Sequence, residues 1–203
     1  MAYEGRVANI EYGYALTLPD GWFRLDVTRQ VTDEYLAGLE GDPLVVRACE
    51  RNADPETYER CVDDKVQELL DYMDPYLENG LSLLAFDIAT IDSFAPSALQ
   101  VFSTASLGQS IDYFELIAPA HTRELYRDEL VDLSSSRFAV PSGEVVYITY
   151  ELDFGVEPHT FVHDFYFLAG ETVHVVSLGG EGRRNALANA AASLAESFEY
   201  LSE

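Results

Sequence analysis

The chain has 203 residues, 48% of them hydrophobic and 12% aromatic, which suits one globular domain with a full core. Its 36 acidic and 12 basic residues give a formal net charge of −24, which excludes DNA or RNA as an ordinary partner and disfavours an anionic membrane surface. A basic protein or a cation would be attracted. The bases are Arg except for Lys65. GC-rich codon bias and adaptation to high salt both remain open as causes of this composition, and we favour the first.

The N-terminal part predicts a hairpin. Residues 12–18 alternate between large apolar and small side chains, as in a half-buried strand, and residues 22–27 predict the strand that returns. Between them lies Leu18-Pro19-Asp20-Gly21. Pro fixes φ at the second position of this turn, and Gly accepts the left-handed conformation.

A helical region is predicted over about 42–80. Asp42-Pro43 and Asp54-Pro55 each combine a capping side chain with Pro at the first helical position. After the second pair, apolar residues recur on one face of a helix, while acidic residues occupy the other. Asp74-Pro75 is expected to stop or kink this helix, and Asn79-Gly80 to end the region.

The middle of the chain predicts two strands, a helix and an edge strand. Residues 81–91 are apolar on both alternating faces, as in a central strand, residues 93–97 form a loop, and residues 99–102 belong to a further strand. Ser110 caps a helix that Pro119 interrupts, with a second helical piece to about residue 130. Residues 137–140 are expected to form an edge strand.

The last part predicts three strands and a covering helix. Apolar residues alternate over 146–154 and 161–168, and a third strand covers 173–178. Gly179, Gly180 and Gly182 are expected to break that strand before an amphipathic helix. Because turns join most of the strands, the fold class is α+β: a single antiparallel sheet with helices packed on its faces, in one domain of residues 1–203.

Two stretches resemble the PsbP-like superfamily, which includes Mog-type Ran-binding proteins and LpqN-type bacterial lipoproteins. The first is the segment 14–22, with Leu-Pro-Asp-Gly-Trp at its end, and the second is the apolar strand 173–178, the helix from Arg183 and the pair Ser197-Phe198. The helical region 42–80 is longer than is usual in that family. The resemblance implies an antiparallel sheet between helices and a binding or assembly role, and it supplies no catalytic residue.

Three histidines are the first candidates for a site. His159 and His163 would lie about 13 Å apart on one face of a strand, too far apart to bind one metal ion, and His174 could approach His163 from the neighbouring strand. We expect no metal, cofactor or catalytic residue. The segment Gly179-Gly180-Glu181-Gly182 lacks the spacing of a phosphate loop and is expected to be a flexible exit from the sheet.

Other candidate groups also have ordinary explanations. Ser134-Ser135-Ser136 is interpreted as a turn before a strand, and the acid pairs Asp63-Asp64 and Asp128-Glu129 as solvated surface. Cys49 and Cys61 fall on helical patterns where buried free thiols are common, and whether they pair stays open. Most of the 13 Tyr and 11 Phe are expected in the core, but an uncovered region of the sheet would present aromatic surface suited to protein binding.

The sequence therefore favours a non-enzymatic, acidic binding or accessory protein that engages another protein. Residues 1–6 lack the basic and apolar regions of a signal peptide, and no stretch is long enough for a membrane span, which predicts a cytoplasmic protein. One alternative is an exported, lipoprotein-like module of the cell envelope whose leader is missing. A less favoured alternative is a metal-dependent enzyme built on His159, His163 and His174.

Overall fold

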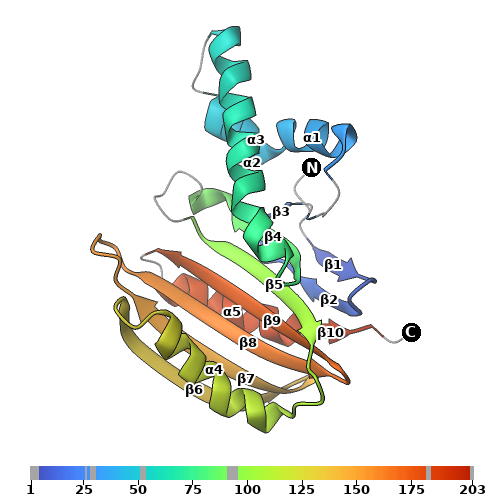
Figure 1. The fold of residues 1–203 in the computed structure, drawn as a ribbon, viewed down its shortest axis with the longest axis vertical. Helices are drawn as coiled ribbons and strands as arrows, with labels where there is room; N and C mark the ends of the chain where they lie inside the picture. The colour runs from blue at the N-terminus through green and yellow to red at the C-terminus, as the bar shows by residue number, and fades with distance from the viewer. Residues whose placement is uncertain are drawn as a thin grey trace.

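The computed structural model describes residues 5–25, 27, 31–50, 54–90, 96–181 and 184–201 (Figure 1). The strands are β1 (Arg6–Asn9), β2 (Tyr14–Thr17), β3 (Trp22–Leu25), β4 (Leu81–Asp87), β5 (Ala98–Ala105), β6 (Leu130–Val140), β7 (Gly143–Leu152), β8 (Thr160–Ala169), β9 (Thr172–Glu181) and β10 (Glu199–Tyr200). The helices are α1 (Asp33–Glu40), α2 (Pro43–Cys49), α3 (Pro55–Leu77), α4 (Ile111–Leu125) and α5 (Arg184–Ser197), with a 3-10 turn at Ile88–Thr90.

The strands form two antiparallel sheets. Seven strands lie in the order β3-β4-β5-β9-β8-β7-β6, and three shorter ones in the order β1-β2-β10. The α+β class and the antiparallel pairing are thus confirmed, whereas the expectation of a single sheet is wrong. The four strands β6 to β9 follow one another as hairpins, and β9 then pairs with β5, which brings the two halves of the chain together.

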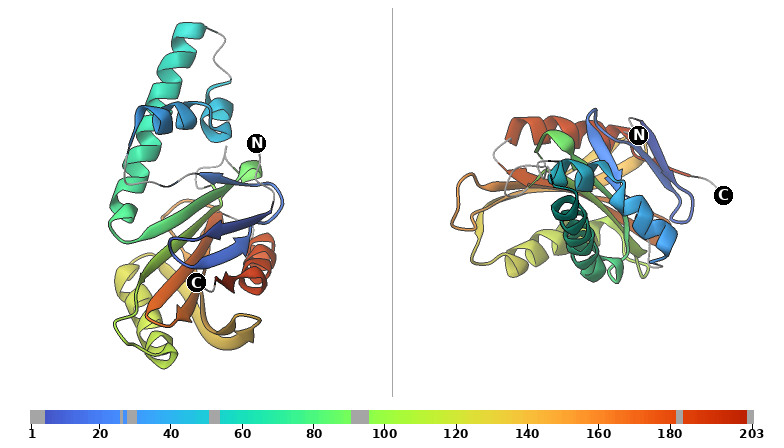
Figure 2. Two further views of the ribbon diagram at one scale, coloured as in Figure 1. Left: turned by 90° about the vertical axis from the view of Figure 1, so that its right-hand side faces the viewer. Right: turned by 90° about the horizontal axis from the view of Figure 1, so that it is seen from above.

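Helices cover both faces of the seven-stranded sheet. Helix α4 lies on one face, where Ala118 packs on a cluster that includes Val146 and Ile148 of β7. Helix α5 and the three-stranded sheet lie on the other face, and the view from above separates α4 and α5 clearly (Figure 2). Alternation along β7 explains this arrangement, because its even residues face α4 and its odd residues face α5.

Helices α1, α2 and α3 form a helical unit beside β3 and β4 (Figure 1). Asp42 and Asp54 cap α2 and α3 as predicted, each side chain accepting a hydrogen bond from a backbone N–H in the first turn. Pro75 lies inside α3, which continues to Leu77. Gly80 then adopts a φ of +85° and lies against the backbone of Ser103, a conformation and a separation that favour glycine.

The predicted N-terminal hairpin does not form, although its turn does. The predicted turn exists, since Trp22 N–H donates to the carbonyl of Pro19 over 3.1 Å and Gly21 has a φ of +80°. The strands on either side of it belong to different sheets, because β2 pairs with β1 and β10 whereas β3 pairs with β4. Alternation predicted the strands correctly, but it carries no information about which strand each one pairs with.

Two helix and strand boundaries also differ from expectation. Helix α4 runs unbroken through Pro119 to Leu125, and β6 then begins at Leu130, well before the expected edge strand. Ala118 and Pro119 are buried against the sheet, and this packing outweighs the roughly 3 kcal/mol that an interior Pro costs a helix. Strand β4 ends at Asp87, while Ile91 and residues 93–95 of the expected strand and loop lie outside the described residues.

Candidate binding surface between helices α3 and α4

A row of aromatic and apolar side chains crosses the sheet between α3 and α4, which lie on the same side of it (Figure 1). Tyr166 on β8 lies opposite Val175 on β9, which in turn lies opposite Phe102 on β5. Phe114 of α4 stacks on Tyr166 with ring centroids 6.0 Å apart, and Tyr76 of α3 lies 6.1 Å from Phe102. All five side chains are partly exposed. We call these five residues the aromatic row.

A polar row lies beside the aromatic row on the same strands. Asp164 on β8 pairs in register with Ser177 on β9, which pairs with Gln100 on β5. Gln100 Nε2 donates to Tyr72 Oη of α3 over 2.9 Å. The row therefore ties α3 to the middle of the sheet and supplies polar groups next to an apolar surface.

Asp164 is the buried acid of this row. It is 7% exposed, and its Oδ1 has no hydrogen-bond partner. Burial raises its pKa to about 6, although hydrogen bonds with Ser177 and Tyr150 act in the opposite direction. Tyr150 is itself buried, and Tyr126 stacks on it with ring centroids 5.7 Å apart. Asp164 thus carries a proton more readily than an exposed aspartate does.

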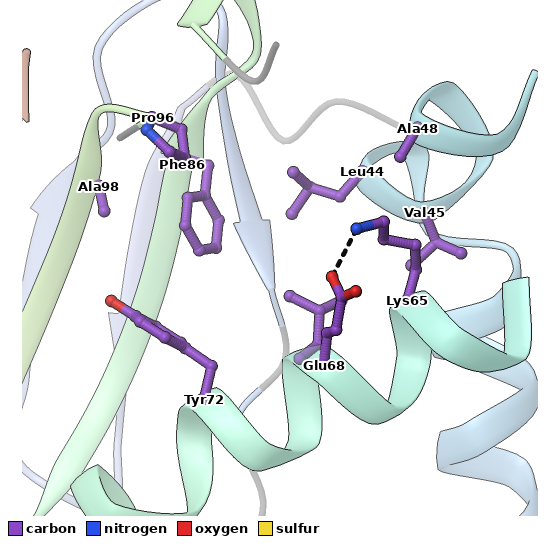
Figure 3. Close-up of a pocket in the computed structure, with 10 residues that line it drawn as sticks. Leu44, Val45, Ala48, Lys65, Glu68, Tyr72, Phe86, Pro96 and Ala98 are labelled. Atoms are coloured by element: carbon purple, nitrogen blue, oxygen red, sulfur yellow. Dashed lines mark hydrogen bonds and ion pairs between the residues drawn. The ribbon is translucent and has the colours of Figure 1, made fainter. Parts of the chain in front are cut away.

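The polar row ends at Tyr72, which also lines a pocket of about 490 Å³ between the helical unit and strands β4 and β5 (Figure 3). This volume suits a small molecule or one large side chain of a partner. Most of the lining is apolar, and the charged pair Lys65–Glu68 lies on the α3 side. The lining residues are Leu44, Val45, Ala48, Lys65, Glu68, Leu69, Tyr72, Phe86, Pro96 and Ala98. Figure 3 shows Leu44 and Phe86 pointing into this space, while Tyr72 lies below them with its hydroxyl toward Ala98.

A disulfide holds the two helices that form one wall of the pocket. Cys49 of α2 and Cys61 of α3 are bonded, with Cα atoms 5.8 Å apart. The structure therefore answers the question of pairing that the sequence left open. The two cysteines lie on either side of the Asp54-Pro55 cap, 12 residues apart in the sequence. Helices α2 and α3 carry Leu44, Val45 and Leu69 into the pocket, so the disulfide holds together the two helices that supply these side chains.

The structure places the three histidines in three separate environments. His163 is 3% exposed, and its Nδ1 lies 2.6 Å from Tyr147 Oη. His174 is 1% exposed, and its Nδ1 lies 3.0 Å from Ser103 Oγ. Burial lowers the pKa of each to about 4, so both are neutral at pH 7. His163 pairs with Leu178 and His174 pairs with Phe167, so the two do not meet across the hairpin.

His159 lies just before β8, among carboxylates. Its Nδ1 is 2.6 Å from Glu151 Oε1, and its Nε2 is 3.4 Å from Glu157 Oε1 and 3.7 Å from Asp153 Oδ2. The hydrogen bond with Glu151 is the main reason that its pKa is raised. Within the described part of the chain, no group of three or more His, Cys, Asp or Glu residues is arranged to hold a metal ion.

His174 belongs to a buried chain of hydrogen bonds between the two sheets. Tyr14 Oη lies 3.0 Å from Ser82 Oγ, which lies 3.0 Å from Ser103 Oγ, the partner of His174. The rings of Tyr14 and Phe198 enclose the imidazole, with centroids 5.2 and 5.6 Å away. This Ser–His contact therefore joins the layers of the core, and water has no access to it.

The glycine segment is part of a strand. Gly179 and Gly180 lie inside β9, which continues to Glu181, so the expected break is wrong, while Gly182 and Arg183 lie outside the described residues. A Cβ atom on Gly180 would lie 2.9 Å from the Cα of Ser97. The glycine is needed for close approach between neighbouring backbones.

The serine run and the acid pairs have structural positions. Ser134-Ser135-Ser136 lies within β6 and not in a turn, which corrects the earlier interpretation. Asp63 and Asp64 are exposed on α3, and Asp128-Glu129 lies in the turn that follows α4. The sequence did not single out Asp164 or Gln100. Asp164 could have been found from the sequence, because it is an acid inside the apolar run of β8. No sequence signal points to Gln100.

Comparison with solved structures shows the fold. The cyanobacterial PsbP protein CyanoP from Synechocystis sp. PCC 6803 matches with a TM-score of 0.50 and 11% identity, over 98% of this chain and 95% of that one. A protein from Bacteroides thetaiotaomicron matches with a TM-score of 0.45 and 10% identity, over 98% of this chain and 49% of the other. The chain has a PsbP-like fold, as the resemblance at its two ends implied.

Neither a family model nor a curated protein matches the sequence. Among the described helices, none is both long enough and apolar enough to span a bilayer.

Proposed function

We propose that this protein is a non-enzymatic accessory protein that binds another protein on the surface between α3 and α4. The partner contributes an apolar side chain to the pocket and lies along the aromatic row. The observation that carries the proposal is the continuity of these two features, because Tyr72 lines the pocket and also bonds to Gln100 of the polar row. Half-buried aromatic residues next to an apolar pocket are typical anchors of a protein interface.

The charge of the surface indicates a basic partner. The exposed side of α3 carries Asp64 and Asp71, which lie four and three residues from the pocket residue Glu68 and so on the same side of the helix. The only lysine, Lys65, is already paired with Glu68. With a net charge of −24, the chain attracts a positively charged segment over a distance of several ångströms, more strongly at low salt. An apolar anchor flanked by Lys or Arg fits both the pocket and its surroundings.

The disulfide supports the exported alternative over a cytoplasmic location. Structural disulfides form and persist in oxidising compartments such as the periplasm or the cell exterior, and they are rare in the cytosol. Cys49 is fully buried, so the bond belongs to the core of the helical unit. We therefore place the proposed interaction in the cell envelope or outside the cell.

A photo-crosslinking experiment tests the proposal. A photoreactive phenylalanine analogue replaces Tyr72, which is 39% exposed, and the purified protein is illuminated in an extract of the native cell envelope. The same analogue at Ala192, exposed on α5, is the control. We expect one recurrent protein adduct from position 72 and none from position 192, and the adduct should weaken as salt is raised.

A second variant tests whether the adduct depends on the pocket or on non-specific binding. Ala48 is exposed at the pocket, so Ala48→Arg should fill it without disturbing the core, while Ala192→Arg adds the same charge elsewhere. The adduct at position 72 should disappear with Ala48→Arg and persist with Ala192→Arg. Equal yields from the two variants would refute a role for the pocket.

A further inference from the structure

Strand β6 is an unprotected edge of the seven-stranded sheet. Within the described residues β7 is its only strand partner, and both figures of the fold place β6 at the outer margin of the sheet (Figures 1 and 2). It has 11 residues, and none of its side chains is buried. About every second residue of an antiparallel strand directs its N–H and C=O away from its neighbour, so β6 presents roughly five such residues on its free side.

The usual protections of an edge strand are missing from most of β6. Sheets avoid edge-to-edge pairing with short edges, charged side chains, Pro, bulges or a covering segment. Residues 132–140 contain neither Lys nor Pro, and the one irregularity of register lies at the start, between Leu130 and Asp132. The charged side chains of this stretch are Asp132 and Arg137, and Arg137 is held in ion pairs on the α4 side. Helix α4 covers a face of the sheet near β6 and leaves its free side open (Figure 1).

The α4 side of this edge carries excess negative charge. Arg137 on β6 forms ion pairs with Asp112 and Glu115 of α4 and with Glu144 of β7. Three carboxylates share one guanidinium, which leaves two negative charges unmatched in this cluster. A strand added beside β6 would place its side chains on this face next to the cluster, where Lys or Arg would be favoured.

The opposite face of the same edge is apolar. Phe138 is 38% exposed, and its ring lies edge-on to Tyr147 and Phe165, with centroids 5.9 and 6.5 Å away. These residues belong to the α5 side of the sheet, whereas Arg137 faces α4. The two sides of β6 therefore favour different side chains on an added strand.

We propose that β6 binds an extended segment of a partner protein as an eighth strand of the sheet, in which basic residues alternate with apolar ones. Backbone hydrogen bonds hold the segment, its basic side chains face Asp112, Glu115 and Glu144, and its apolar side chains pack beside Phe138. Charge disfavours a second copy of this chain in the same position, because each copy carries −24. The edge is distinct from the pocket, so this inference goes beyond the proposed function and does not depend on it.

A synthetic peptide tests the inference with the full chain. The probe is an 11-residue peptide of alternating Lys and Val, and its control has N-methyl groups on all internal amides, so that neither edge of the peptide can donate hydrogen bonds to β6. Hydrogen exchange should show protection by the probe confined to 130–140, and calorimetry should show at least tenfold weaker binding of the control. Ser135→Lys, exposed on β6, should weaken binding, while Ser193→Lys, exposed on α5, should not.

Three results would overturn the inference: equal binding of the N-methylated peptide, protection outside β6, or a dimer that protects β6 without peptide in sedimentation at high salt. The last would assign the edge to self-association. Ala48→Arg distinguishes this surface from the proposed function, because it should leave peptide binding unchanged while removing the adduct at Tyr72.

Discussion

Replacing Asp164 with Asn should change how the stability of this protein depends on pH. Asp164 lies under α4 with Tyr126, Tyr150 and Tyr166 around it, Ser177 beside it on β9, and no cation among these neighbours. Burial raises its pKa to about 6 from an ordinary value of 3.8. Since the folded state binds this proton more tightly than the unfolded state does, the protonated form favours folding and the ionised form opposes it.

The raised pKa of Asp164 determines the sign and size of this pH dependence. Its contribution to the free energy of unfolding is fully favourable below pH 3.8 and is lost as pH rises through about 6. A shift of this size, at about 1.36 kcal/mol per pH unit, corresponds to roughly 3 kcal/mol, which is an upper figure because buried groups relax. Asp164→Asn removes the ionisation. Its free energy of unfolding, relative to the wild type, should therefore rise by about 1–3 kcal/mol between pH 4 and pH 7.5.

The assay is urea unfolding of both proteins at several pH values, followed by circular dichroism. Comparing the two proteins at each pH cancels the titration of every other group. Asp63→Asn on α3 is the matched control, since it makes the same substitution at a carboxylate that is exposed to water. A difference for Asp164→Asn that is flat across this range would refute the reasoning about burial.

Two further predictions concern the backbone. Reducing the Cys49–Cys61 disulfide, or replacing both cysteines with Ala, should lower the free energy of unfolding by about 3 kcal/mol in chemical denaturation, and an unchanged midpoint would contradict a stabilising bond. Gly180→Ala should destabilise by about 1–3 kcal/mol, because its Cβ would collide with Ser97, whereas Gly38→Ala, in open space on α1, should stabilise by about 0.5–1 kcal/mol. Equal changes in the melting temperatures of the two variants would contradict the predicted collision with Ser97.

Local sequence signals predicted the elements well. Asp54-Pro55 specifies the start of α3 because a side-chain cap and a fixed φ act within one turn, and the structure has that cap. Alternation placed β7, β8 and β9 correctly because burial on a sheet repeats every two residues. These signals need only a few neighbouring residues, so one sequence suffices to find them.

The sequence did not predict contacts between segments that are far apart in the chain. The separation of β2 and β3 into two sheets, and the insertion of β5 beside β9, depend on which strands pair, which residue types alone do not specify. Gly180 looked like a strand end because its need for space comes from Ser97, more than eighty residues earlier. The candidate site combines α2, α3, β4 and β5 for the same reason, so the sequence predicted aromatic residues on strands, Tyr166 among them, but not where an uncovered region would lie.

The most direct measurement is the affinity of the captured partner for the wild type, Ala48→Arg and Ala192→Arg at low and high salt. Binding through the pocket and the acidic surface predicts at least tenfold weaker binding by Ala48→Arg, no change with Ala192→Arg, and weaker binding by the wild type as salt rises. Equal affinities for all three proteins, independent of salt, would contradict the proposed function.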